Sequence, residues 1–526
     1  MPISAWALEE VIVTATRTAV ALADYPGSAT RIVAESLELT GATYSAELLN
    51  RAPGTMIQRG SGQESLTALR SPVLTDAGAC GAVLVLEDGI PIRPVGSCNV
   101  NELFEVNLEQ AAAVEVLRGP GSVLYGSSAV HGIINVLPPL PDEVPVLGIA
   151  LEAGSDAYRR ARLAASAESE QSGLGVVLHA TDDGGWRDAS GFEEQKLNAV
   201  WTRPLARGVL TLRAAGSNLD QETAGFILGE NAFRNRAIAR SNPDPEAYRD
   251  ATSLRFAAQY RDVTGHELRA YFRSSRMEFL QHFLLGQPVE DNGQDSGGLM
   301  FTATGKPFAA GELIFGLDAE AASSSLLQFQ SGPTTDGSPA ANAIRPAGRH
   351  YDYEVNSRVI AGYAQWRRVL SRRWSFETGL RLENARYDYD NRMIDGNTDE
   401  NGVACPGGCL YSRPSDRSDE FTNLAPRIGL VWRMTDASTA YLSLARGFRA
   451  PETTELYRLQ RQQTIDDLDS ERADAAELGL RWRAAATALD VALFHMDKRD
   501  VILRDSAGFN VSGGRTRHLG LEYQGE

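Results

Sequence analysis

One run of sequence decides the fold: Val114-Glu-Val-Leu-Arg-Gly-Pro-Gly-Ser-Val-Leu-Tyr-Gly-Ser-Ser-Ala-Val-His-Gly-Ile-Ile-Asn-Val136. It predicts a strand, a turn built on Gly119-Pro-Gly121, a short segment ending at Gly126, and a second apolar strand closed by Pro138 and Pro139. Nothing in it is typical of an active site. Taken alone, the run would also suit a glycine-punctuated strand pair in an unrelated α/β domain.

The size of the chain excludes a single ordinary core. With 526 residues it must divide into domains or wrap around something. It has no run of eighteen apolar residues, and its mean hydropathy of −0.25 predicts no membrane-spanning helix. These values are compatible with a transmembrane barrel, whose strands face lipid with alternate residues only. The net charge of −17 argues against nucleic acid and fits an exported protein with acidic loops.

The four cysteines fall into two local pairs, Cys80 with Cys98 and Cys405 with Cys409. The first pair lies at one end of a hairpin predicted over residues 82–92, and the second closes a Cys-Pro-Gly-Gly-Cys loop. We expect two disulfides and therefore an oxidising compartment. The alternatives are free buried thiols for the first pair and a zinc site for the second, which would need two further ligands.

Beyond Pro145 the sequence alternates apolar and polar residues, most clearly over residues 374–383. This period of two predicts strands with one face toward lipid. Long polar stretches separate some segments, whereas short turns such as 370–373 separate others, a pattern typical of outer-membrane barrels. A soluble β-sandwich would alternate in the same way. The other alternating segments are 147–152, 160–168, 174–180, 209–214, 427–432, 478–483 and 489–494.

The amino end shows part of an export signal. Ser4-Ala-Trp-Ala7 is the small-x-small pattern that signal peptidase reads, so we expect residues 1–7 to be a signal-peptide remnant and the mature chain to begin near Leu8. The following Glu9-Glu-Val-Ile-Val-Thr-Ala-Thr-Arg17 is a β-branched segment that could add edge-on to a partner's sheet. The first strand of any domain would read the same way.

Several segments together resemble the TonB-dependent outer-membrane receptors. The run 114–136 resembles the last signature segment of their plug domain, and residues 9–17 resemble their TonB box. Ala445-Arg-Gly-Phe-Arg-Ala-Pro451 is similar to a barrel motif of the family, and Gly520-Leu-Glu522 is similar to a later strand. One departure is Ser71-Pro72, where most relatives have glycine after the equivalent of Arg70.

The resemblance, which covers essentially the whole chain, implies a membrane all-β fold. We expect a large antiparallel transmembrane β-barrel plugged by a small N-terminal α/β domain. The domains would be 1–7 (signal remnant), 8–30 (TonB box and linker), 31–140 (plug) and 141–526 (barrel). Within the plug, residues 37–50 show loose helical spacing. A plugged barrel has about 22 strands, and relatives continue past residue 522, so we expect the barrel to be C-terminally incomplete.

The resemblance also implies a function, which is TonB-dependent uptake across the outer membrane of a Gram-negative bacterium. The implied partners are TonB with its inner-membrane, proton-driven motor complex, and the surrounding lipid and lipopolysaccharide; we expect a monomer that binds no nucleic acid. No HExxH, GxSxG or P-loop is present and the seven histidines are scattered, so we expect no catalytic residues, metal site or cofactor. The expected TonB contacts are Glu10, Val11, Ile12, Val13, Thr14 and Ala15.

The commonest cargo of such receptors is a ferric siderophore, and we expect basic, polar and aromatic loop residues to contact it. Residues 277–283 fit either a loop that contacts cargo or a strand with its aromatic girdle. Cobalamin, another scarce metal chelate or an oligosaccharide are alternatives, whereas residues 452–474 lack the histidine of haem receptors. A passive porin or adhesin is the alternative of another class. The expected cargo contacts are Arg59, Gln63, Arg93, Asn99, Arg187, Arg234, Arg236, Phe279, His282 and Phe283.

Overall fold

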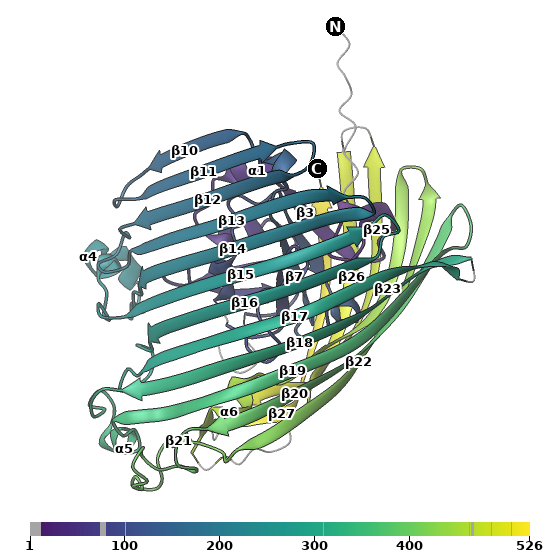
Figure 1. The fold of residues 1–526 in the computed structure, drawn as a ribbon. Coiled ribbons are helices and arrows are strands. Elements are labelled where there is room, and N and C mark those ends of the chain that lie inside the picture. The colour runs from purple at the N-terminus through teal and green to yellow at the C-terminus, as the bar shows by residue number, and fades with distance from the viewer. Residues whose placement is uncertain are drawn as a thin grey trace.

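The computed structural model describes residues 12–73, 80–99, 101–308, 310–461, 463, 468–484, 487–506 and 508–525. Within them, a large curved antiparallel sheet, here called the wall, surrounds an N-terminal domain, here called the plug (Figure 1). This arrangement confirms the expected fold class of an antiparallel barrel sheet with an N-terminal plug. No helix among the described residues is long and apolar enough to cross a membrane.

The plug is built on a five-stranded sheet with the order β3-β8-β9-β6-β7. Only the β6–β9 pair is parallel. Short helices and a hairpin surround this sheet and bury the apolar side chains of the plug core. The bounds are β3 (Ser28–Val33), α1 (Ala34–Thr40), α2 (Ser45–Leu49), β4 (Thr55–Arg59), β5 (Ser65–Leu69), β6 (Val83–Glu87), β7 (Ile90–Pro91), β8 (Ala113–Arg118), α3 (Ser122–Tyr125) and β9 (Gly132–Leu137).

The run 114–136 forms the centre of this sheet. It supplies β8, a glycine turn, the single-turn helix α3 and β9, which confirms the predicted order of strand, turn, short segment and strand. Gly119 and Gly126 have φ of 86° and 77°, which glycine adopts without strain. A Cβ at Gly132 would lie 2.3 Å from the Leu117 carbonyl oxygen, so only glycine fits there.

The segment 37–50 differs from its prediction. It forms two short helices, α1 and α2, because Gly41 takes a left-handed conformation (φ 55°) that ends the first.

The wall contains sixteen described strands, each antiparallel to the next. Among the described residues β10 pairs only with β11 and β27 only with β26, so the sheet is open between them. The bounds are β10 (Leu147–Ala153), β11 (Arg159–Glu168), β12 (Gly173–Asp183), β13 (Phe192–Leu205), β14 (Gly208–Glu222), β15 (Tyr248–Asp262), β16 (Glu267–Leu280), β17 (Val289–Phe308), β18 (Gly311–Gln330), β19 (Gly348–Val369), β20 (Trp374–Asn391), β22 (Arg417–Thr435), β23 (Ser438–Arg449), β25 (Glu471–Ala484), β26 (Thr487–Arg504) and β27 (Asn510–Gly525).

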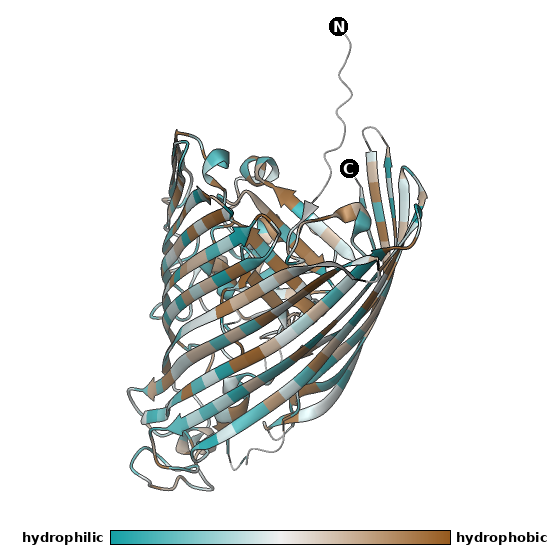
Figure 2. Ribbon diagram, turned by 45° about the vertical axis from the view of Figure 1, so that its right-hand side comes forward, coloured by the Kyte–Doolittle hydropathy of each residue, from teal (hydrophilic) through white to brown (hydrophobic). Residues whose placement is uncertain are grey.

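Alternation along the strands gives the wall two different faces, visible as alternating bands in Figure 2. On β25, Glu477 and Arg481 are buried against the plug, whereas Leu478 and Leu480 between them are 56% and 42% exposed on the outside. The inward face is therefore polar and the outward face apolar. This agrees with the period of two in the sequence, which predicts strands with one face toward lipid.

The connections also differ between the two ends of the wall. At one end are short turns, such as residues 206–207 between β13 and β14 and 370–373 between β19 and β20. At the other end the longest connections carry α4 (Arg236–Arg240), α5 (Pro339–Ala343), β21 (Tyr411–Ser412), α6 (Thr453–Tyr457) and β24 (Leu459–Gln460). Short turns on one side and long loops on the other match the sequence-based expectation for an outer-membrane barrel.

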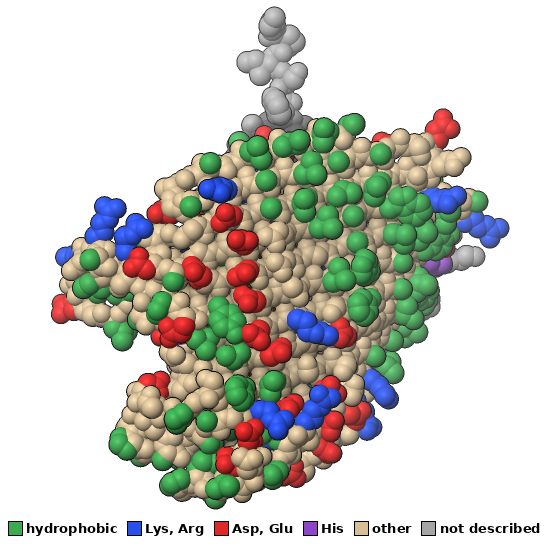
Figure 3. Space-filling view, turned by 60° about the vertical axis from the view of Figure 1, so that its left-hand side comes forward, with side chains coloured by type: hydrophobic (Ala, Val, Ile, Leu, Met, Phe, Trp, Pro, Cys, Tyr) green, Lys and Arg blue, Asp and Glu red, His purple; other side chains and the backbone are tan. Residues whose placement is uncertain are grey.

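Six acidic residues form a continuous row on the outer face, near the long-loop end of the wall. Each lies directly opposite the next across neighbouring strands, and all six are exposed. Figure 3 shows acidic side chains in a row over this face. We call this row the acidic ladder; its members are Asp182, Glu193, Asp220, Asp250, Glu278 and Asp291.

Candidate functional site: the plug and the wall around it

The plug is attached to the last strands of the wall through Arg70, which follows β5. Its Nη1 lies 2.5 Å from a Glu477 oxygen on β25, and its Nη2 lies 2.7 Å from a Glu522 oxygen on β27. The Tyr441 hydroxyl on β23 donates to Glu477 at 2.5 Å, and Arg118 lies 3.6 Å from Glu522. All of these side chains are buried. Buried charges are costly unless paired, so the cluster fixes the plug against these strands.

The linker before β3 is attached to the same strands. Arg481 on β25 donates to the carbonyl oxygens of Leu22 and Tyr25 at 2.7 and 2.8 Å and also to that of Gly27. The plug is therefore held here by its backbone as well as by its charges.

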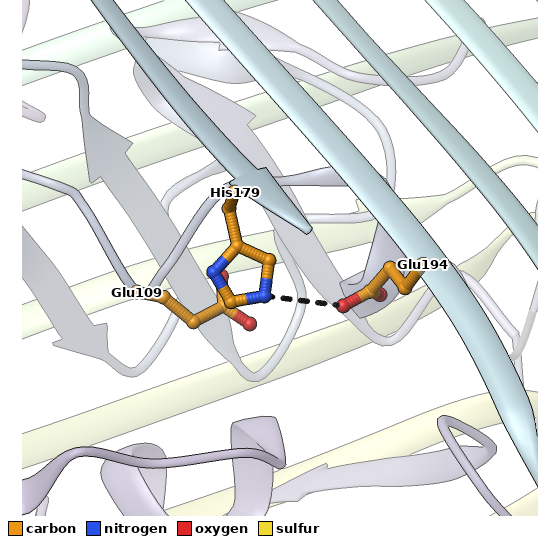
Figure 4. Close-up of side chains that lie close together, drawn as sticks. All are labelled: Glu109, His179 and Glu194. Carbon is orange, nitrogen blue, oxygen red and sulfur yellow. Dashed lines mark ion pairs between the residues drawn. The ribbon is translucent and has the colours of Figure 1, made fainter. Parts of the chain in front are cut away.

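A second attachment joins the plug to β12 and β13. Glu109 of the plug lies beside His179 and Glu194 of the wall, with ligand atoms within 4.8 Å of one another (Figure 4). Such a set could hold a metal ion, but the Lys196 Nζ lies 3.1 Å from an oxygen of each carboxylate. Burial is the largest influence and raises the pKa of Glu109, but the Lys196 ammonium, His179 and the hydrogen bonds to the carboxylate together hold that pKa below its ordinary value. The Lys196 ammonium therefore supplies the cation of this cluster. We assign the cluster to attachment of the plug to the wall.

A cavity of about 70 Å³ lies between the plug and the wall strands β16–β20. We call it the chamber. Arg93 and Glu102 line it from the plug, Asp318 and Glu383 line it from the wall, and Glu452 lines it from the loop before α6. It is large enough for several water molecules and is lined by charged groups from three parts of the molecule.

Two carboxyl groups of the chamber lie farther from their cations than the carboxylates paired with Arg70. The shortest distance from Glu102 to Arg93 is 4.0 Å, and that from Glu452 to Arg449 is 3.7 Å. Burial raises the pKa of Glu102 to about 8 and that of Glu452 to about 7, and neighbouring carboxylates add to both shifts. Both groups therefore hold a proton more firmly than an exposed carboxyl group.

Arg17, the last residue of the segment that resembles a TonB box, ties this segment to both plug and wall. Its guanidinium donates to the Leu124 carbonyl oxygen at 2.6 Å and pairs with Asp318 on β18 at 2.8 Å. Asp318 also pairs with Arg381 on β20 at 2.7 Å, and all three residues line the chamber. Arg17 therefore connects the amino-terminal segment directly to charged side chains that line the chamber.

The expected TonB contacts lie only partly within the described residues. Glu10 and Val11 lie outside them. Ile12 and Val13 form β1, which pairs with β2 (Val20–Ala21), while Thr14 and Ala15 contact the plug. The contact with TonB stays a prediction.

The expected cargo contacts of the plug fall into two groups. Arg59 is exposed, with its guanidinium 3.2 Å from the centre of the Tyr44 ring. Gln63 is buried and donates from its backbone to Gln221 at 2.6 Å, and Asn99 is buried beside Met277. Arg93 pairs with Glu105 and faces the chamber. Only Arg59 of these four is open to solvent.

The expected contacts from the wall are also divided. Arg187 donates to the carbonyl oxygens of Gly225 and Ser241 at 2.8 Å and so braces the loop 223–247, where Arg234 and Arg236 are exposed. Phe279 is buried at the end of β16, so residues 277–280 are strand. His282 packs edge-on against the exposed Phe283. Contact of any of these side chains with cargo stays a prediction.

An aromatic cluster at the long-loop end was missed in the sequence. Its tyrosines come from β19, β20 and α6 and their rings are buried, with the Arg458 guanidinium 5.9 Å from the centre of the Tyr351 ring. Three of the hydroxyls have no hydrogen-bond partner among the described residues. The signal was the spacing Tyr-x-Tyr at two strand ends, which places both rings on one face. The members are Tyr351, Tyr353, Tyr387, Tyr389 and Tyr457, and the three hydroxyls belong to Tyr353, Tyr387 and Tyr389.

Both cysteine pairs are disulfide-bonded. Cys80 and Cys98 have Cα atoms 5.7 Å apart at the chamber, and Cys405 and Cys409 have theirs 4.8 Å apart in the loop 392–416.

Comparison with known proteins agrees with this architecture. Residues 183–526 match the family model described as TonB dependent receptor-like, beta-barrel, and residues 21–133 match the TonB-dependent receptor plug domain. The vitamin B12 transporter BtuB of Vibrio vulnificus (strain CMCP6) is 31% identical over 186 residues. That match covers 35% of this chain and 29% of the transporter.

Solved structures share the fold. The unliganded ferric citrate transporter FecA superposes with a TM-score of 0.75 at 18% identity, over 96% of this chain and 75% of that one. The ferric yersiniabactin uptake receptor FyuA from Yersinia pestis gives 0.71 at 18% identity, over 95% and 76%. The chain therefore belongs to the TonB-dependent receptors, a family of Gram-negative outer-membrane proteins.

Proposed function

We propose that this protein transports a scarce ligand into the periplasm with energy delivered through TonB. The observation that supports this most strongly is the plug seated inside the wall and attached to it on several sides. A plug that fills the space inside the wall obstructs the passage of solutes, so transport requires that the plug be displaced. The protein would act by moving its ligand and not by catalysing a reaction.

We propose that the plug is displaced by a pull on the amino-terminal segment. Residues 14–17 are bonded to the plug and to β18, so a pull on the segment before them acts on both. The proposed partner is TonB with its proton-driven inner-membrane complex, which would pair with residues 10–15 by adding a strand.

The proposed cargo is a ferric siderophore complex. FecA and FyuA are by name a ferric citrate transporter and a ferric yersiniabactin receptor, which supports an iron chelate. The exposed Arg59, Arg234 and Arg236 could donate to an anionic chelate, because guanidinium groups bind carboxylates in pairs of hydrogen bonds. Cobalamin is the second candidate, and the local similarity to a vitamin B12 transporter favours it.

Growth of a deletion strain on single iron or cobalamin sources tests the cargo. The strain is grown with and without the gene, on ferric citrate, on hydroxamate, catecholate and phenolate siderophores, and on cyanocobalamin. Gene-dependent growth on one iron chelate supports the proposal. Growth that depends on the gene only with cyanocobalamin transfers the assignment to cobalamin, and no response to any iron chelate refutes the siderophore.

Conductance in planar bilayers separates a gated transporter from a passive porin. The full chain should pass almost no current, whereas a matched variant lacking residues 31–140 should conduct. A full chain that conducts as well as the deletion variant would identify a porin.

A further inference from the structure

The outer face of the wall carries opposite charges in two sectors. The acidic ladder extends across β12–β17, whereas three exposed arginines, here called the arginine patch, lie on the outer face of β25, β26 and β27. Arg472 lies between the buried Glu471 and Ala473, so it points to the same side of β25 as the exposed Leu478. The members of the patch are Arg472, Arg499 and Arg515.

The three arginines of the patch lie at one level across their strands. Arg472 is directly opposite Arg499 across the β25–β26 pair. Arg515 precedes Thr516, which is opposite Lys498, and therefore lies on β27 at the level of the other two. Side chains directly opposite each other have Cβ atoms about 4.5–5.5 Å apart, and like charges there destabilise the strand pair. An anion bound over the patch would remove this repulsion.

The carboxylates next along this face are paired with other arginines. Asp474 on β25 pairs with Arg446 on β23 at 2.7 Å. Asp497 on β26 pairs with Arg517 on β27 at 2.9 Å, and Arg499 acts on Asp497 only from farther away. Within the described residues, no member of the arginine patch forms a salt bridge. The patch therefore adds positive charge that the carboxylates of this face do not balance.

The leucines of the same outer face show the depth of the patch in the membrane. Leu519 on β27 is 70% exposed and lies opposite His495 on β26. Arg515 is four residues from Leu519, a separation of about 13 Å along the strand and, at a tilt of about 40°, about 10 Å along the membrane normal. Lipid headgroups begin where the hydrocarbon core ends. The arginine patch therefore lies at the depth of headgroups, on the side of the long loops.

We propose that the arginine patch binds the phosphate groups of lipopolysaccharide, while the acyl chains of the same molecule lie against the leucines of β25–β27. Guanidinium groups bind phosphate through paired hydrogen bonds, and opposite charge attracts the lipid to this sector. The acidic ladder repels the same phosphates, so direct contact is confined to the arginine side. Binding of this lipid is a property of the outer face and depends on neither cargo nor TonB.

The test is titration of the full chain in detergent with diphosphoryl lipid A, the phosphorylated lipid of lipopolysaccharide, with the bound lipid counted by native mass spectrometry. EDTA is present, because divalent cations would otherwise bridge phosphates to the acidic ladder. The combined substitutions Arg472→Gln and Arg499→Gln should weaken binding about tenfold or more, which corresponds to about 1.4 kcal/mol. The combined substitutions Arg372→Gln and Arg373→Gln are the matched control, because they remove the same charge from exposed positions at the short-turn end.

Weaker binding by the patch variant, with the control at the wild-type affinity, supports the proposal. An unchanged affinity of the patch variant, or an equal fall in the control, overturns it. Lipid A without its phosphates should bind the wild type about tenfold more weakly, and equal affinity for both lipids overturns the proposal as well. Binding by the wild type only after Mg²⁺ is added would overturn it and assign the lipid to the acidic ladder. If the patch variant does not fold, Arg515→Gln decides: a smaller fall supports the proposal and no fall overturns it.

Discussion

The plug meets β25–β27 and β16–β20 in different ways. Toward β25 and β27, the Arg70 guanidinium is matched by two carboxylates at 2.5 and 2.7 Å. Toward β16–β20 lies the chamber, where Glu102 is 4.0 Å from its nearest cation. One side combines close contact with balanced charge, whereas the other combines space with unbalanced charge. On the chamber side the plug is still bonded to the wall, because Arg17 pairs with Asp318 at 2.8 Å and the Pro91 carbonyl oxygen accepts from Arg273 at 2.6 Å.

The largest expected effect comes from breaking the balanced side. Arg70→Ala removes the cation closest to the buried Glu477 and Glu522 and leaves Arg118 at 3.6 Å from Glu522, and unpaired buried charges typically cost about 3–5 kcal/mol. Hydrogen exchange of β4 and β5 should accelerate strongly. Arg59→Ala, which removes an exposed arginine of the same hairpin, is the control and should leave exchange unchanged. Equal protection in both variants would show that the ion pairs do not hold the plug.

Tyr441→Phe tests how much of that side depends on hydrogen bonds. The variant removes the hydroxyl that donates to Glu477 at 2.5 Å but leaves both ion pairs of Arg70. A hydrogen bond to a charged group contributes about 1.5–3 kcal/mol, so β5 should lose less protection than in Arg70→Ala. A loss as large as that of Arg70→Ala would assign the attachment to the hydroxyl network.

The free energy of unfolding should depend on pH because of the carboxyl groups that line the chamber. The carboxyl of Glu102 keeps its proton up to about pH 8 in the folded protein but loses it near 4.5 in an unfolded chain. Between these values the folded state binds more protons, so stability falls as pH rises from 5 to 8, and Glu452 acts in the same direction up to about pH 7. Glu102→Gln should make this fall shallower by on the order of 1–3 kcal/mol in denaturant titrations at several pH values. An unchanged pH slope would contradict the assignment.

The smallest effect is expected on the outer face, where the acidic ladder has like charges and no matching cations along its row. Asp250 lies directly opposite both Asp220 and Glu278. Asp250→Asn should raise the unfolding free energy by about 0.2–1 kcal/mol, because like charges across a strand pair destabilise it. At about 1 M salt the gain should vanish, since the screening length falls to about 3 Å. A gain that persists in high salt would point to a cause other than repulsion.

The strands were largely predictable because a period of two is a local property of the sequence. Segments 374–383 and 478–483 lie in β20 and β25 as predicted. The division of 37–50 into two helices was missed, although Gly41 was the signal for it.

The contacts between plug and wall were not predictable, because they join residues far apart in the chain. Arg70 and Glu522 each stood in a recognised motif, yet nothing local indicates that the Arg70 guanidinium meets carboxylates more than 400 positions away. The burial of Gln63 and Asn99 was missed for the same reason: loop composition suggests exposure, but the position of the plug within the wall decides it.

The Cys80–Cys98 bond limits how the plug can be stretched. A force applied at the amino end can draw the chain out in single file only as far as residue 80. The next 18 residues form a covalently closed ring, which withholds roughly 60 Å of contour length at about 3.4 Å per residue. Pulling on single molecules should therefore yield shorter extensions under oxidising conditions than after reduction.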